Sequence, residues 1–171
     1  MLMEIVKKRK SVRRYKKKDI PDEIIKEIIE CARLAPSAKN LQEWKFIVVK
    51  DEETKKKLVD VAKGQRFVGE AYAVIAGVAT STNYIMTNGV PAHYVDLAIA
   101  MEHISLLATE KGIGSCWIGA FYQDKAKDVL EVPDGCEIVA LMTLGYPEEE
   151  LKPGEKNRKK MEEIICWEKY C

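Results

Sequence analysis

The densest group of chemically capable side chains lies near the N-terminus. Between Lys7 and Lys18, nine of twelve residues are basic. Arg9, Ser11 and Arg13 alternate along this run and could grip a phosphate, because arginine offers a planar fork for phosphate oxygens and a serine hydroxyl adds a further hydrogen bond. The same composition is typical of a solvated charged face and of an arm that binds nucleic acid. The run by itself leaves all three interpretations open.

A second polar stretch follows the first long helical pattern. Residues 37–44 read SAKNLQEW, in which Ser37, Asn40 and Gln42 offer hydrogen-bond donors and acceptors. Binding residues are often found in loops that rigid elements hold in place. The stretch therefore predicts either a binding loop or an ordinary connection between a helix and a strand.

The histidines and cysteines indicate no metal site. His93 and His103 are ten residues apart, which separates them by about three helical turns. The cysteines form no CxxC pair and have no zinc-like spacing. They are Cys31, Cys116, Cys136, Cys166 and Cys171. The start of the chain is too short and too charged for a secretory signal. An odd number of cysteines in a chain without such a signal predicts reduced thiols in a reducing compartment.

Sequence motifs for several common kinds of catalysis are missing. The chain has no GxxxxGK[ST] phosphate loop, no GxSxG nucleophile elbow and no HExxH. Gly112 and Gly114 have GxG spacing, but they follow a helical pattern and lack the third glycine of a dinucleotide-binding fingerprint. We therefore expect a bound organic cofactor to carry the reactivity, and we assign no side chain a catalytic role.

A long apolar helix must position these residues. Ten of the fourteen residues from Val95 to Ala108 are apolar, and a helix that is apolar almost all round is buried in a core or between subunits. Asp96 in its first turn and Lys111 in its last suit the helix dipole, and Gly112 supplies the stop. The next segment, GIGSCWIGAF, is small and rich in glycine, so its backbone can approach a ligand closely.

The rest of the chain alternates helical and strand patterns. Helices are expected over residues 3–9, 20–35, 52–63 and 123–130, and strands over 45–50, 73–79 and 138–146. Residues 80–91 are polar and aromatic and predict a loop or lid. Strands separated by helices favour helices packed on a central sheet. We therefore predict a single α/β (α+β) domain over residues 1–171, with a mixed central sheet.

Composition limits the class of protein. The 171 residues suffice for one domain with its own core, and 47% hydrophobic with 32% charged residues is typical of globular proteins. A formal net charge of +1 argues against a dedicated nucleic-acid binder. No apolar run approaches the roughly 20 residues that a membrane span needs. We expect a cytoplasmic protein that engages neither nucleic acid nor membrane.

Five segments in order resemble the FMN-dependent nitroreductase family. They are RKSVRRY near the start, APSAKNLQEWKFIVV after the first long helix, GIGSCWIGAF after the apolar helix, LGYP, and EKNRKK near the end. The resemblance covers nearly the whole chain. It implies a nitroreductase-like fold, an intertwined homodimer with shared flavin sites, FMN as cofactor, and NADH or NADPH as hydride donor.

The resemblance also implies which residues bind the flavin. The matching positions are Arg9, Lys10, Ser11, Arg13, Pro36, Ser37, Asn40, Trp117, Ile118, Gly119, Ala120, Lys156 and Arg158. Arg9 and Ser11 would lie near the phosphate and ribityl chain, and Arg13 near the pyrimidine edge of the ring. Pro36, Ser37 and Asn40 would reach the flavin of the partner subunit. The segment from Trp117 to Ala120 would lie against the ring near N5. Lys156 and Arg158 would hold the phosphate.

The implied activity consists of two half-reactions that alternate at one site. NADH or NADPH would deliver a hydride to flavin N5, and a small organic acceptor such as a nitroaromatic or quinone would then take the electrons. Arg13 would stabilise negative charge near N1, and backbone N–H groups of Gly119 or Ala120 would tune N5. Other flavin redox tasks (dehydrogenation, dehalogenation or flavin fragmentation) are an alternative, and a non-catalytic nucleic-acid-binding module is another.

Two positions depart from the family pattern. Gln42-Glu43-Trp44 stands where the family usually has Gln-Pro-Trp, which changes the expected path of this loop. Gly119 stands where members often have an acidic residue. A backbone donor survives that change, whereas a side-chain role does not.

Overall fold

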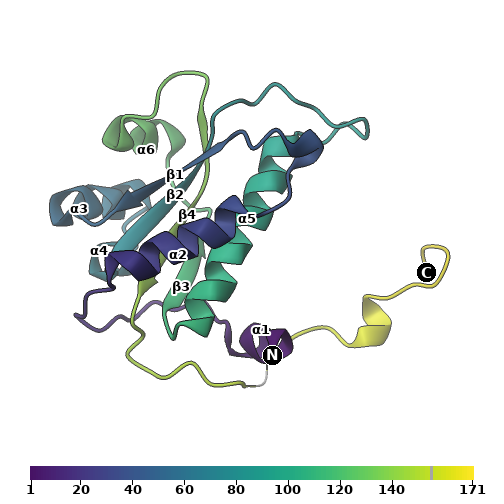
Figure 1. Ribbon diagram of the computed structural model, residues 1–171, viewed down its shortest axis with the longest axis horizontal. Helices are drawn as coiled ribbons and strands as arrows, with labels where there is room; N and C mark the ends of the chain where they lie inside the picture. Colours follow the sequence, from purple (N-terminus) through teal and green to yellow (C-terminus); the bar gives the residue numbers. More distant parts are fainter. Residues whose placement is uncertain (155) are drawn as a thin grey trace.

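The computed structural model describes residues 1–154 and 156–171. In it, helices cover both faces of a four-stranded sheet (Figure 1). The helices are α1 (Leu2–Lys8), α2 (Asp22–Arg33), α3 (Glu52–Val61), α4 (Phe67–Glu70), α5 (Ala92–Glu110) and α6 (Gln123–Leu130), with short 3₁₀ helices η1 (Ala38–Asn40) and η2 (Met161–Glu163). The strands are β1 (Trp44–Val49), β2 (Ala73–Ala79), β3 (Gly114–Ile118) and β4 (Glu137–Gly145).

The sheet has the strand order β1-β2-β4-β3, so β1 and β3 form its opposite edges. Every residue of β2 is buried. Ile75 packs in the core with α2 and α5, whereas Val74 and Ala76 pack in the core with α3 and α6, because successive side chains of a strand point to opposite faces. These contacts confirm the predicted arrangement of helices on a central sheet.

The four strands pair antiparallel with one another. In addition, Ser11 and Ser115 form an isolated bridge in parallel orientation, which sets the N-terminal segment beside β3. The strand β3 itself is absent from the sequence-based expectations, because Gly, Ser and Cys do not favour strands locally. Its pairing with β4, from Gly114 opposite Gly145 onward, makes it a strand.

The long apolar helix exists as predicted, but it begins before Val95. Because α5 starts at Ala92, Asp96 lies in its second turn rather than its first. The Asp96 carboxylate instead accepts a hydrogen bond from the backbone N–H of Ala38 at 3.0 Å. Gly112 adopts a left-handed φ of 73° after the helix, as expected for a stop. No described helix combines the length and apolar composition that crossing a bilayer requires.

The outer face of α5 is apolar and exposed. Tyr94 is 43% exposed and Val95 is 37% exposed, and the same shallow surface includes Ala98, Ile99 and Leu106. The inward side chains Leu97, Met101 and Ile104 are fully buried. The helix is therefore apolar nearly all round, but a single chain buries only its inner side.

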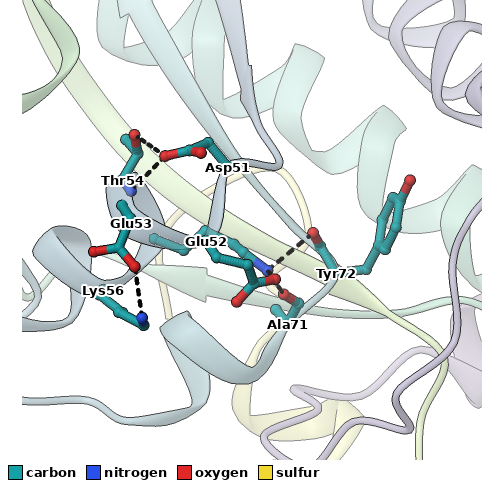
Figure 2. A network of polar contacts seen from close by, with 8 residues as sticks. Asp51, Glu52, Glu53, Thr54, Lys56, Ala71 and Tyr72 are labelled. Atoms are coloured by element: carbon teal, nitrogen blue, oxygen red, sulfur yellow. Dashed lines mark hydrogen bonds and ion pairs between the residues drawn. The ribbon is translucent and has the colours of Figure 1, made fainter.

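Polar contacts tie α3 to the residues that lead into β2 (Figure 2). Asp51 caps the helix by accepting a hydrogen bond from the N–H of Thr54 at 2.8 Å. Lys55 is almost fully buried, and its ammonium group donates to the carbonyl oxygens of Ala71 at 2.7 Å and Tyr72 at 3.3 Å. These bonds offset the cost of burying a charge.

The C-terminal segment departs from the expected cysteine chemistry. Cys166 and Cys171 are joined by a disulfide bond, so the prediction of reduced thiols is wrong for these two residues. Cys31, Cys116 and Cys136 are free thiols, as predicted. Residues 157–171 are all exposed, and they run away from the sheet past α1 (Figure 1).

Candidate cofactor site

The N-terminal basic run forms an extended segment along the edge strand β3. The backbone N–H of Val12 donates to the carbonyl of Ser115 at 2.9 Å. A Cβ atom at Gly114 would lie only 2.7 Å from the Val12 side chain, so this close approach requires glycine. Side chains alternate in direction along an extended chain. Because the Val12 side chain points into the protein, those of Ser11 and Arg13 point outward, and both residues are exposed.

Tyr15 holds the far end of this segment in place. Its hydroxyl donates to the carbonyl of Val12 at 2.6 Å and lies 2.7 Å from Thr143 Oγ1. Its ring lies over Gly145, where a Cβ atom would come within 2.6 Å of the Tyr15 ring. Burial raises the pKa of Tyr15, and the hydrogen bond with Thr143 opposes this only in part. The hydroxyl therefore stays protonated at neutral pH and keeps its donor role.

Three side chains of the run lie near one thiol of β3. Burial raises the pKa of Cys116, while the charge of Arg13, a hydrogen bond from Ser11 and the charge of Arg9 act in the opposite direction. The guanidinium carbon of Arg13 also lies 5.7 Å from the centre of the Phe67 ring. The alternation seen in the sequence thus brings Arg9, Ser11 and Arg13 to one region.

Two cations from the other end of the chain join this region. The Lys156 Nζ donates to the carbonyl oxygens of Val6 at 2.5 Å and Arg9 at 2.8 Å, at the end of α1. Desolvation, and then the charges of Arg9 and Arg158, lower the pKa of Lys156. We call Arg9, Lys156 and Arg158 the cationic cluster. Because their charges repel one another, an anion bound among them would relieve that repulsion.

The end of β3 and the two residues after it are mostly exposed at the same sheet edge. Trp117 is 40% exposed, and Gly119 and Ala120 are exposed, whereas Ile118 is buried in the core. The carbonyl of Ala120 accepts a hydrogen bond from Gln65 Nε2 at 3.3 Å. Within residues 1–154 and 156–171, the N–H groups of Gly119 and Ala120 donate to no other residue. Two backbone donors are therefore available to a ligand.

The loop that carries Pro36, Ser37 and Asn40 lies at the other edge of the sheet from β3. It leads into β1, the edge strand opposite β3. Since neighbouring strands are about 4.8 Å apart, the two edges are separated by roughly 14 Å. Within one chain, the structure does not bring this loop to the cationic cluster.

Left-handed backbone shapes this loop. Lys39, Asn40 and Gln42 have φ values of 52°, 56° and 54°, and the Ser37 hydroxyl accepts a hydrogen bond from the N–H of Gln42 at 3.1 Å. A proline restricts the residue before it to extended conformations. Glu43, in place of the family's usual proline, therefore permits the left-handed Gln42.

Comparison with known proteins identifies the family. The family model for the nitroreductase family matches residues 6–89 and 64–146. An NADH dehydrogenase of Thermus thermophilus is 30% identical in an alignment that covers 94% of this chain and 92% of that protein. The chain belongs to the nitroreductase family. This family member is accordingly an oxidoreductase enzyme.

Solved structures of nitroreductases share its fold. A nitroreductase family protein from Clostridium novyi NT is 36% identical, with a TM-score of 0.81 over 87% of this chain and 86% of that one. An FMN-dependent nitroreductase from Clostridium difficile R20291 is 28% identical, with a TM-score of 0.84 over 98% and 99% of the two chains. The predicted nitroreductase-like fold is confirmed.

The structure adds contacts for some of the predicted site residues of this nitroreductase. The Lys10 ammonium group lies 3.8 Å from a carboxylate oxygen of Glu149, and its role in flavin binding stays a prediction. The side chain of Ile118 packs in the core, and Ile118 pairs with Leu141 of β4. Sequence reasoning missed Tyr15 and Thr143, whose roles depend on a contact across 128 residues.

Proposed function

We propose that this chain binds FMN and transfers hydride equivalents from NADH or NADPH to a small organic acceptor, such as a nitroaromatic or a quinone, by a ping-pong cycle. The cationic cluster is the observation that carries this proposal. Residues from both ends of the chain meet there, and the pKa of Lys156 is lowered in part by Arg9 and Arg158. A gathering of cations suits a phosphate monoester, which carries about two negative charges at neutral pH.

The residues fit FMN in the chemistry of their donors. Arg9, Lys156 and Arg158 would hold the phosphate, and Ser11 would serve the ribityl chain. The free N–H groups of Gly119 and Ala120 would face N5 of the ring. Bound FMN would supply the two-electron chemistry that the protein side chains lack.

Each remaining role falls to a residue of the chain. Arg13, held near Phe67, would place a positive charge at the pyrimidine edge and stabilise negative charge there. Trp117, which is 40% exposed, would provide an apolar surface beside the ring and exclude water from it. We assign no side chain an obligatory proton transfer.

The proposed active form is a homodimer with two shared flavin sites. The exposed apolar face of α5, from Tyr94 to Leu106, supports an interface between two copies. The separation of the sheet edges supports a shared site. In this proposal Pro36, Ser37 and Asn40 complete the flavin site of the partner subunit.

The test offers the purified protein FMN and riboflavin separately. We expect FMN to bind at about one per chain and riboflavin to bind at least roughly hundredfold more weakly, because riboflavin lacks the phosphate that the cationic cluster would hold. Under anaerobic conditions, NADH or NADPH should bleach the bound flavin, and a nitroaromatic or quinone should restore its colour.

Each part of the proposal has an outcome that contradicts it. Equal affinity for the two flavins would refute the phosphate role of the cluster. A bound flavin that neither nicotinamide bleaches would point to another flavin redox task of the family. Failure to bind any flavin, together with salt-dependent DNA binding, would favour the nucleic-acid module.

A further inference from the structure

We propose that Cys166 and Cys171 form a reversible dithiol–disulfide centre that exchanges electrons with low-molecular-weight thiols. The two residues are separated by five positions, and their Cα atoms are 5.6 Å apart, a distance at which disulfides form readily. This centre lies in the exposed C-terminal segment. Its chemistry goes beyond the proposed flavin function and does not depend on it.

The position of the bond argues against a role in holding the fold together. It closes a ring of residues 166–171 at the end of the chain, and every residue from 157 to 171 is exposed. A disulfide stabilises a fold mainly by restricting the unfolded chain, and this effect is smallest for short loops. The bond joins the terminal segment only to itself. It can therefore open and close without disturbing the sheet or its helices.

The two sulfurs have different surroundings. The backbone N–H of Cys171 donates a hydrogen bond to Cys166 Sγ at 3.0 Å. A hydrogen bond of this kind stabilises negative charge on sulfur and makes Cys166 the better leaving thiolate. Cys171 is consequently the sulfur that an incoming thiolate attacks.

The exchange balances in two steps. A thiolate from the small thiol forms a bond to Cys171 Sγ, the bond between Cys166 and Cys171 breaks, and Cys166 leaves as a thiolate that takes up a proton. A second small thiolate then attacks the external sulfur of this mixed disulfide, and Cys171 leaves and is protonated. Two small thiols are oxidised to one small disulfide, and the protein pair gains two electrons and two protons.

The other cysteines lack these properties. Burial raises the pKa of Cys116 and of Cys31, which keeps both in the less reactive thiol form. Cys136 is half-buried and is a free thiol. The chain therefore provides its own matched controls for reactivity at the C-terminal pair.

The experiment places the full-length protein in a series of reduced-to-oxidised glutathione mixtures, followed by alkylation and mass spectrometry of the C-terminal peptide. We expect the ratio of dithiol to disulfide to rise with the square of the reduced glutathione concentration and to fall in proportion to oxidised glutathione. The melting temperature should be the same for both forms. Cys136→Ser should leave the titration unchanged.

Single-cysteine variants test the chemistry of the pair. Cys171→Ser should leave Cys166 able to form one mixed disulfide with glutathione and no internal bond. A pair that stays bonded until the protein is denatured would overturn the proposal, as would a pair that is alkylated at every ratio. A melting temperature that falls on reduction would assign the bond a structural role and would equally overturn it.

Discussion

At the scale of single residues, Lys156 links the two ends of the chain. Its ammonium group donates to the carbonyl oxygens of Val6 and Arg9, and the nearby charges of Arg9 and Arg158 lower its pKa. Lys156 thus orders the end of α1 while it adds positive charge. Arg158 is exposed and bonds only its neighbouring carbonyl among the described residues, so its charge can be removed without loosening α1.

Replacing Arg158 with Gln should weaken FMN binding. One charge-assisted hydrogen bond is worth about 1.5–3 kcal/mol, which corresponds to a roughly ten- to hundredfold higher Kd. Fluorescence titration with FMN measures the change. Lys152→Gln, a nearby exposed position paired with Glu150, is the control and should leave Kd unaltered. A similar loss of riboflavin affinity in Arg158→Gln would argue against a phosphate contact.

Replacing Arg13 with Ala should lower the reduction potential of bound FMN and slow its reduction. The physical reason is the loss of a positive charge that stabilises the negative charge gained at the pyrimidine edge. Anaerobic spectroelectrochemical titration measures the potential. Arg14→Ala removes an adjacent, exposed arginine and should have little effect. An unchanged potential in Arg13→Ala would refute the proposed role.

At the scale of elements, the candidate site depends on how the segment of residues 9–15 fits against β3 and β4. Val12 and Tyr15 lie over Gly114 and Gly145, where a Cβ atom would come within 2.7 Å and 2.6 Å of their side chains. Neither glycine has a left-handed φ, so both are required by close packing rather than by backbone conformation. The position of Arg9, Ser11 and Arg13 follows from this fit.

Gly145→Ala should therefore weaken both the fold and cofactor binding. The added methyl group would displace the Tyr15 ring, and overpacking of this kind costs about 1–3 kcal/mol. We expect a melting temperature lower by about 2–4 °C for each kcal/mol lost, together with weaker FMN binding. Thermal unfolding and FMN titration measure the two effects. Gly154→Ala, where a Cβ atom would meet nothing within 4 Å, should change neither quantity.

At the scale of the whole molecule, the order of the strands decides how the site is assembled. The cationic cluster and residues 117–120 lie at the β3 edge, whereas the loop of residues 36–40 lies at the β1 edge. The α5 helix leaves an apolar face exposed on one side. Both features support the proposed homodimer, in which a second copy would cover α5 and supply the loop of residues 36–40.

Val95→Glu should shift the protein from dimer to monomer and reduce FMN binding. The side chain is already exposed in a single chain, so the substitution spares the core and places a charge within the apolar interface. Analytical ultracentrifugation and FMN titration measure the outcome. Lys57→Glu, on α3 at the opposite face of the sheet, should leave the dimer intact. A Val95→Glu dimer with full FMN affinity would contradict the shared site.

The amino-acid sequence by itself determined the family and most of the secondary structure. The bounds of β2 and α6 match the predicted ranges residue for residue, because continuous apolar runs, amphipathic periodicity and turn residues act over a few neighbouring positions. The five family segments, which are also local patterns, were sufficient to indicate the nitroreductase fold. Local patterns were sufficient for both conclusions.

Only the tertiary structure decided which of these residues meet. The strand β3 depends on its partner β4, Lys156 reaches Arg9 across 147 positions, and Asp96 bonds Ala38 rather than serving its own helix. The Lys10 ammonium group likewise meets Glu149, 139 positions away in the sequence. Such contacts join residues far apart in the sequence, and their energies depend on packing and burial that no short stretch of sequence encodes.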